Sequence, residues 1–471
     1  MSTNLPAFTN VPSHLLGHLI DRITPSASFR QRFLLVLLLC NGLRVAEAQT
    51  TVGKSDKLLV DLLNSRAELF QKTLSAKAPD GSPVYDVQIV YTQINRDAAN
   101  RPSFKTYRYQ VDKDRYFYPA STVKFPAVLL ALETLNTLKI NREATMLTDS
   151  AYARQTSVHR DTTAKNGLPS VGQYARKILI VSDNDAFNRL YELVGQCAFN
   201  DRLEAKGYLD TRIVHRLEVS MTADQNAHTN PVYLFDNREP TTKELEAFLK
   251  TKDPLAAMMK KLPPQFCDHT PKAPAPILRG TGYMKYTSKG DSLVKQPFDF
   301  TAKNAYPLTD QQAVLRAVLF PETMAAKQRF NLTPDDYRFV YRYMSQLPRE
   351  TRYPNYRADT SLYDSYCKFL MVGDQKNPMP KSVRIFNKVG DAYGYLLDNA
   401  YIVDFEKGVE FMLSAVISCN SDGIFNDSKY DYETVGYPFL GNLGRLIYDH
   451  EVSRKKTRKP DLSKFKLVYT D

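Results

Sequence analysis

The sequence predicts a mixed α/β fold of the α+β type, in which an antiparallel sheet is built from both chain ends and flanked by helices. Near the beginning, residues 85–94 and 103–111 alternate apolar and polar side chains, as paired strands do. Near the end, three further strands are predicted over 382–390, 395–405 and 408–418. Because helical segments lie between these strands, a helical lobe is expected to be inserted into the sheet.

The predicted helices follow from apolar residues that recur at helical spacing. The first begins at about Lys57, and others are predicted over 122–138, 170–182 and 184–194. A last helix over 437–449 follows the final strand. With 471 residues, of which 43% are hydrophobic, the chain is long enough to bury a large core around this arrangement.

Residues 222–304 interrupt this order, because they are rich in proline and polar residues and contain a hairpin-like segment at 283–300. They are interpreted as an inserted lid or surface subdomain, with a structureless excursion as the open alternative. The main domain then covers 57–450, and the basic tail 451–471 is expected to be a solvated end. The sheet lobe covers about 57–118 and 383–450, and the helical lobe about 119–221 and 305–382.

The N-terminal region has the composition of a secretory signal peptide, predicted over residues 1–48. Arg30 and Arg32 precede the apolar run 33–43, and Ala-Glu-Ala follows at 46–48. This apolar run is too short for a bilayer span, which needs about twenty residues. The mature protein is therefore expected to be exported, to the periplasm or the outside of the cell, without an integral membrane span.

The cysteines are compatible with an oxidising compartment. Cys40 lies in the signal region, but the leucine before it argues against a lipid-anchored protein. Cys197, Cys267, Cys367 and Cys419 remain after cleavage and could form two bridges in any of three pairings. Buried free thiols with at most one bridge are the more common outcome.

Composition argues against metal and nucleic-acid functions. The seven histidines form no metal-ligand cluster, because segment 14–18 lacks the glutamate of a zinc-protease motif and segment 267–269 stands alone. The formal charge of +12 favours anionic surfaces, which for an exported protein are envelope polymers rather than nucleic acid. No metal, cofactor or nucleic acid is therefore expected.

Ser121 and Lys124 form a Ser-x-x-Lys motif at the start of an apolar, helix-like run. Residues three apart share one face of a helix, so the lysine could activate the serine, and the helix N-terminus would favour an oxyanion. Ser121 could equally be an ordinary helix cap, and Pro126 is costly inside a helix. The same motif also occurs at Ser365, Ser453 and Ser463.

Two further segments follow Ser121 along the chain. Ser182 and Asn184 belong to the only Ser-Asp-Asn, in which the serine could relay a proton and the amide could hold a substrate carbonyl. The same tripeptide is also a good helix start. Lys388 lies on a predicted strand, and Gly390 offers a position where a substrate backbone could approach closely. The three segments in this order are far more specific than any one of them.

The chain resembles the penicillin-recognising serine hydrolases, most closely the class A serine β-lactamases, which carry Ser-x-x-Lys, Ser-Asp-Asn and Lys-Thr-Gly in this order. The approach to Ser121 (RYFYPAS) and residues 167–190 follow the family pattern. Glu218 lies 36 residues after Ser182, where this family places its deacylating glutamate. The resemblance covers most of 57–450 and implies the serine β-lactamase and penicillin-binding-protein fold.

The resemblance also implies a role for each matched residue. Ser121 would be the acylated nucleophile and Lys124 its base, if burial and a nearby Lys388 lower the pKa of Lys124. Ser182 would pass a proton to the leaving nitrogen, and Lys388 would supply positive charge to Ser182 and to the substrate carboxylate. The backbone N–H groups of Ser121 and Asp391 would form the oxyanion hole.

Several positions depart from the family pattern. Val389 replaces the hydroxyl residue of Lys-Thr-Gly, and no arginine occurs between Lys388 and the end of the next predicted strand. Two usual contacts to the β-lactam carboxylate are therefore missing. Thr222 stands where an asparagine usually fixes the hydrolytic water, and no proline follows Glu218. Glu218 is thus either the deacylating base or an ordinary loop carboxylate.

The sequence predicts an exported, monomeric serine hydrolase that forms an acyl-enzyme, with β-lactam amide bonds as the leading substrate. The alternative enzyme is a D-alanyl peptidase, a penicillin-binding protein or an esterase with the same acyl-serine chemistry, and its substrate could be a cell-wall peptide. The alternative outside enzymes is an envelope-binding protein that retains the pocket.

Overall fold

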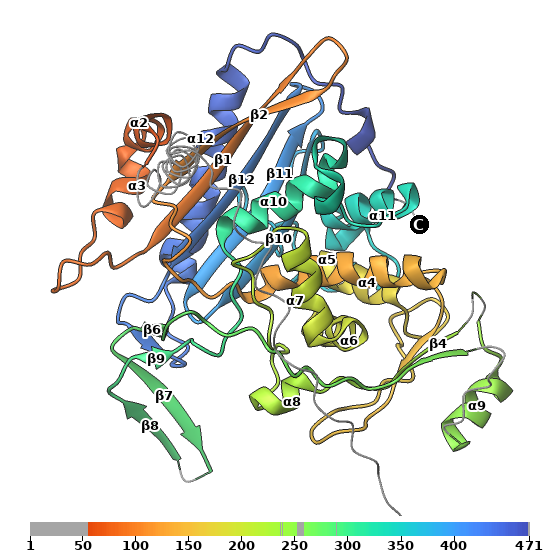
Figure 1. Cartoon of the computed structure of the whole chain (residues 1–471). Coiled ribbons are helices and arrows are strands. Elements are labelled where there is room, and N and C mark those ends of the chain that lie inside the picture. Colours follow the sequence, from red (N-terminus) through yellow and green to blue (C-terminus); the bar gives the residue numbers. More distant parts are fainter. Residues whose placement is uncertain (1–54, 236, 238, 252–258, 289, 470–471) are drawn as a thin grey trace, which may run out of the picture. The chain divides into compact units, whose positions relative to one another are not determined.

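The computed structural model describes residues 55–235, 237, 239–251, 259–288 and 290–469, so the predicted signal peptide, 1–48, lies outside the described residues. The described chain contains a five-stranded antiparallel sheet in the order β10, β11, β12, β1, β2 (Figure 1). The prediction of an α+β fold whose sheet is built from both chain ends is confirmed. The strands are β1 (Val87–Arg96), β2 (Pro102–Tyr109), β10 (Val383–Ala392), β11 (Tyr395–Asp404) and β12 (Val409–Ser418).

Helices cover both faces of this sheet, because its central strands are apolar on both sides. On β11, Tyr401 and Val403 pack into the core with α4, α5, α6, α10 and α11. Their neighbours Ala400 and Ile402 pack on the other face with α2, α3 and α12. The helices are α2 (Lys57–Ser65), α3 (Ala67–Leu74), α4 (Lys124–Leu138), α5 (Val171–Val181), α6 (Asn184–Val194), α7 (Gln196–Ala205), α8 (Ala223–Ala227), α9 (Thr242–Thr251), α10 (Leu308–Leu319), α11 (Pro334–Ser345) and α12 (Tyr437–Ser453).

Two predicted helices differ in detail from those observed. The helix predicted from about Lys57 is broken at Arg66, whose backbone (φ −130°, ψ 48°) is not helical, and forms α2 and α3. The helix predicted over 122–138 begins with a 3-10 turn, η1 (Ala120–Val123), followed by α4. Pro126 therefore lies in the first turn of α4, where backbone N–H groups have no helical partner and proline costs little.

The segment 222–304 is joined to its surroundings at several points. Strand β4 (Val232–Phe235) pairs with β3 (Met146–Thr148) of the helical lobe and with β5 (Met259–Leu262). The predicted hairpin is present as β7 and β8, and β7 also pairs with β13. A disulfide between Cys197 and Cys267 ties the segment to α7, while Cys367 and Cys419 are free and buried. The remaining strands are β6 (Leu278–Arg279), β7 (Gly282–Thr287), β8 (Gly290–Val294), β9 (Phe298–Asp299) and β13 (Ile424–Phe425).

The basic tail is anchored to the core at Phe465, while Lys455, Arg458 and Lys459 of its basic run are exposed. Phe465 is buried against the rings of Phe320 and Tyr401, and Lys464 Nζ donates to the backbone oxygen of Leu319 at 2.7 Å. Burial of a phenylalanine contributes roughly 1.5–3 kcal/mol, which outweighs the preference of the neighbouring lysines for water. None of the described helices has the length and apolarity that a bilayer crossing requires.

Candidate active site

Ser121 lies in the η1 turn, pressed against the edge strand β10. The residue before it, Ala120, adopts a left-handed backbone (φ 45°), which costs energy for a residue with a Cβ. Gly390 makes the close approach possible, since a Cβ on it would lie 2.9 Å from both Pro119 O and Ser121 N. The backbone of Ser121 is thus held beside Gly390, the residue that precedes Asp391 on β10.

Lys124 is fully buried and is the first residue of α4, three residues after Ser121. Its Nζ donates to the backbone oxygen of Ser182 and, at 3.2 Å, to Ser182 Oγ. Burial lowers the pKa of Lys124 well below its usual range, and the positive charge of Lys388 lowers it further. Lys124 Nζ does not make the expected direct bond to Ser121. Within the described part of the chain, the hydroxyl of Ser121 has no hydrogen bond.

Ser182 joins two helices and faces two lysines. It ends α5 in a left-handed conformation (φ 62°), while Asp183 caps α6 by accepting a hydrogen bond from Ala186 N at 2.7 Å. The Ser-Asp-Asn tripeptide therefore does form a helix start, as its structural interpretation requires. Ser182 Oγ also accepts hydrogen bonds from Lys124 and Lys388, so its own proton remains available to another acceptor.

Lys388 is buried on β10 and approaches Ser182 from the sheet side. Its Nζ donates to Ser182 Oγ at 2.7 Å and to the backbone oxygen of Val389 at 2.9 Å. Burial lowers the pKa of Lys388 to about 8, even though nearby Cys367 and Asp391 act in the opposite direction. Lys124, Ser182 and Lys388 together form a buried cluster, which we call the floor of the site.

Glu218 is exposed and lies on a loop that is rigidly held behind it. The side-chain amide of Asn188 accepts from Leu217 N at 2.9 Å and donates to Leu217 O at 3.0 Å. The buried Arg216 pairs with Glu192 at 2.9 Å, next to Leu217. Glu218 itself has a left-handed backbone (φ 55°) and no ion pair within the described residues.

Thr222 has a structural role in this loop. Its hydroxyl accepts from Gln225 N at 3.2 Å, and the Gln225 side chain accepts from Thr222 N, which together form the capping box of α8. Thr222 does not line the cleft that contains Glu218. Its hydroxyl is therefore engaged at the start of α8 rather than in the cleft beside Glu218.

A cleft of about 610 Å³ brings most of the predicted site residues together. Ser121, Ser182, Asn184, Glu218 and Asp391 all line it. Lys124 and Lys388 reach it through their bonds to Ser182. The described structure thus unites residues from η1, the α5–α6 junction, the Glu218 loop and β10, which lie far apart in the sequence.

Sequence reasoning missed the opposite wall of the cleft. This wall includes Tyr366 and Cys367 from the segment after α11, Glu433 from the π-helical turn η5 (Tyr432–Gly436), and Tyr437 from the start of α12. Burial raises the pKa of the Cys367 thiol, although Lys388 lies near enough to oppose that shift. No motif marks these residues, and only the Ser-x-x-Lys at Ser365 drew attention to the segment.

The second Ser-x-x-Lys, at Ser365 and Lys368, does not form a serine–lysine pair. Ser365 Oγ lines the cleft but donates to the backbone oxygen of Gln375 at 2.6 Å. Lys368 points into the core, where its Nζ donates to Met344 O at 2.9 Å and to Asn387 Oδ1 at 2.6 Å. The spacing alone therefore does not create the arrangement found at Ser121.

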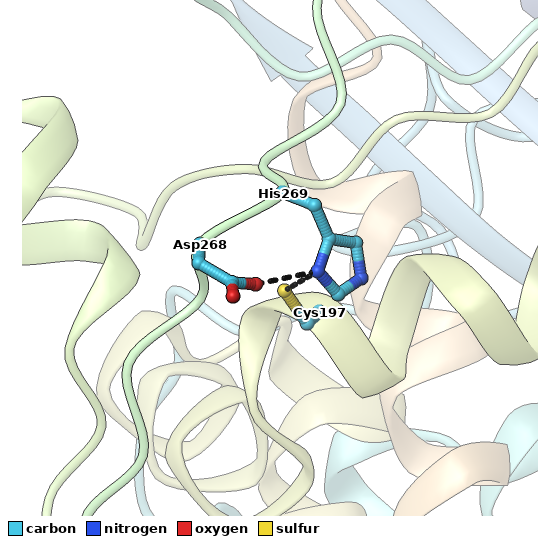
Figure 2. Close-up of side chains that lie close together, drawn as sticks. All are labelled: Cys197, Asp268 and His269. Carbon is cyan, nitrogen blue, oxygen red and sulfur yellow. Dashed lines mark hydrogen bonds and ion pairs between the residues drawn. The ribbon is translucent and has the colours of Figure 1, made fainter. Parts of the chain in front are cut away.

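One group of potential metal ligands lies away from the cleft. His269 Nδ1 is 3.3 Å from Cys197 Sγ and 2.7 Å from an Asp268 oxygen (Figure 2), and its Nε2 is 3.2 Å from Asp201. The sequence suggested that segment 267–269 stands alone, but in the structure His269 lies close to Cys197 and Asp201. Because the sulfur of Cys197 is bonded to Cys267, it is not a thiolate ligand.

Comparison with known proteins gives one family match. A Beta-lactamase enzyme family matches residues 72–261, a range that contains Ser121, Lys124, Ser182 and Glu218. No curated protein matches the chain.

Solved structures similar to this chain include three that share 13% sequence identity with it. The class A β-lactamase from Clostridium kluyveri has a TM-score of 0.43 over 83% of this chain and 98% of its own. The protein PBP-A has a TM-score of 0.41 over 82% and 96%. A β-lactamase from Sphaerobacter thermophilus has a TM-score of 0.38 over 82% and 97%.

Proposed function

We propose that the chain, whose residues 72–261 match a β-lactamase enzyme family, is an exported serine hydrolase that opens β-lactam amide bonds through an acyl-enzyme on Ser121. One observation carries this proposal: Lys124 and Lys388 both donate to Ser182 Oγ in the cleft that Ser121 lines. Two buried lysine side chains that share one hydroxyl are costly for stability, which favours a catalytic reason for their presence. Export rests on the signal-like residues 1–48.

Acylation begins with proton transfer from Ser121. Burial lowers the pKa of Lys124 and so favours its neutral amine form, whose Nζ can take this proton as the serine oxygen attacks the carbonyl carbon. The backbone N–H groups of Ser121 and Asp391 receive the developing oxyanion. When the carbon–nitrogen bond breaks, Ser182 donates its proton to the leaving nitrogen and regains one from Lys124.

Deacylation requires a water and a base. Glu218 lines the same cleft as Ser121 and is the carboxylate suited to take a proton from that water. Because Thr222 is engaged in capping α8, the water is held by fewer partners than in the family pattern. A misplacement of about 1 Å can cost roughly a hundredfold in rate, so deacylation is expected to limit turnover.

The engagement of Thr222 in capping α8, which leaves fewer partners for the deacylating water, also supports a second candidate function. This function is that of a penicillin-binding protein whose acyl-enzyme persists. Incubation with a chromogenic cephalosporin, followed by intact-protein mass measurement, separates the two. Turnover without a lasting adduct supports the hydrolase, and a stable adduct supports the penicillin-binding protein. If neither turnover nor adduct is observed, the β-lactam assignment fails and an esterase or a binding protein remains.

A further inference from the structure

Acidic and aromatic side chains line the cleft beyond its floor. Asp391 lies near the end of β10 and Tyr366 on the segment after α11, while Glu433 lies in the π-helical turn before α12 and Tyr437 begins α12. All four line the cavity that contains Ser121. We propose that these four residues, the cation subsite, bind an ammonium or guanidinium group of the acyl substrate. The inference rests on the proposed function, because it names the substrate class of the same hydrolase.

The two carboxylates of the subsite have no ion pair within the described residues. Asp391 and Glu433 are both solvent-exposed and face the cavity. Asp374 lines the same cavity but is neutralised by Arg445, which donates to its two oxygens at 2.8 and 2.7 Å. Asp374 is thus neutralised by an ion pair, whereas Asp391 and Glu433 are not neutralised in this way by any described residue. Four carboxylates and one exposed ammonium, that of Lys376, line the cavity, and an excess of negative charge in a concave site attracts cationic ligands.

The two tyrosines give the subsite a second means of binding a cation. The hydroxyls of Tyr366 and Tyr437 make no hydrogen bond within the described part of the chain, and burial, then Asp391 and Glu433, raise the pKa of Tyr437. Both rings thus remain neutral and can present their faces to a cation. An ammonium–tyrosine contact of this kind already exists nearby, where Lys376 Nζ lies 5.1 Å from the centre of the Tyr363 ring.

The cleft is poorly equipped for a carboxylate. Val389 is buried and has no hydroxyl, and no arginine lines the cavity among the described residues. The Lys388 ammonium already donates to Ser182 and to Val389 O. A substrate carboxylate placed here would also lie close to Asp391, which interacts electrostatically with both Lys388 and Glu218. The charge pattern beside Asp391 and Glu433 therefore favours a cationic group at this part of the cleft.

Three fluorophosphonates of equal chain length, ending in trimethylammonium, tert-butyl or carboxylate, test the subsite through the labelling rate of Ser121. Trimethylammonium and tert-butyl have nearly the same shape, so the ratio of their rates isolates charge. We expect the cationic probe to label about tenfold faster than the neutral one, and the anionic probe to be the slowest. The ratio should decrease in 1 M salt, because the carboxylates are exposed.

For each variant, the labelling rate by the cationic probe is divided by the rate by the neutral probe. A general loss of reactivity cancels in this cation-to-neutral ratio. Asp391→Asn and Glu433→Gln should each lower the ratio severalfold. Glu406→Gln, which removes one exposed carboxylate at the opposite end of β11, should leave it unchanged. Equal rates for all three probes, or fastest labelling by the anionic probe, would overturn the cation subsite while leaving the nucleophile intact. Absence of labelling by every probe would instead overturn the proposed function, and with it this inference.

Discussion

The floor and the rim of the cleft differ in how their polar groups are satisfied. On the floor, Lys124, Ser182 and Lys388 are joined by hydrogen bonds, and both lysines are buried. On the rim, Glu218 and Glu433 are exposed and have no ion pair within the described residues. Buried charges persist only in a precise arrangement, whereas exposed ones vary at little energetic cost. The floor therefore determines the type of reaction. The rim, formed by the exposed residues that line the cleft above the floor, determines the substrate and the rate of deacylation.

The largest expected effect comes from the nucleophile beside the floor. Ser121→Ala should abolish covalent labelling by a fluorophosphonate and lower turnover at least about a thousandfold, because no other group attacks the carbonyl. Intact-protein mass after incubation measures the labelling. Ser365→Ala is the matched control, since Ser365 lines the same cleft and begins a Ser-x-x-Lys, yet its hydroxyl donates to Gln375 O. Labelling that survives in Ser121→Ala but not in Ser365→Ala would contradict the assignment.

A smaller effect is expected from the charge on Lys388. Because burial lowers its pKa to about 8, Lys388 is protonated below pH 8 and loses its charge above it. Acylation should therefore slow as the pH rises through 8. Lys388→Met should be about a hundredfold slower at neutral pH, as is typical when one preorganised group that stabilises developing charge is removed.

Lys388→Arg separates charge from other causes of this pH dependence. A guanidinium stays protonated throughout the accessible range, so any remaining activity of the variant should no longer decline above pH 8. The measurement is the rate of acyl-enzyme formation by rapid quench between pH 6 and 10. A decline at pH 8 that persists in the variant would show that another group titrates there.

The floor could be predicted from the sequence because its residues belong to regular elements whose patterns are strong. Ser121 and Lys124 begin an apolar helix, Ser182 ends another, and Lys388 alternates with core residues on β10. Their order along the chain resembled a known family, which implied that they meet. The bond actually made by Lys124, to Ser182 rather than Ser121, depends on side-chain rotamers that periodicity does not determine.

The wall of the cleft could not be predicted, because irregular segments form it. Tyr366 lies in a segment without periodicity, and Glu433 lies in a π-helical turn. The Cys197–Cys267 bridge could not be predicted either. Disulfide pairing depends on how close two cysteines lie in space, which their separation along the sequence does not determine. Phe465 shows the same limitation, because the lysines around it dominated the interpretation of the tail.

On the rim, Glu218→Gln should affect only the second half of the reaction. Acylation should remain nearly intact, because among the described residues Glu218 makes no hydrogen bond or ion pair with the floor and its charge has only the smallest of the effects on the pKa of Lys124. The acyl-enzyme should accumulate as deacylation slows about tenfold. The expected effect is modest since the water beside Glu218 is already held loosely. Time-resolved mass measurement after a pulse of cephalosporin gives both rates. If the variant clears its adduct as fast as the parent, Glu218 is an ordinary loop carboxylate.

The smallest effect is expected at Thr222, whose hydroxyl caps α8 instead of facing the cleft. Thr222→Val removes the cap and should lower the free energy of unfolding by about 1 kcal/mol, whereas Thr222→Asn retains a capping oxygen and should change it little. Urea denaturation measures both. Because the asparagine would also be held at the helix start, deacylation should stay within about threefold of the parent. A tenfold faster deacylation in Thr222→Asn would show that the rim can recover the missing water partner by one substitution, and that capping does not fix this side chain.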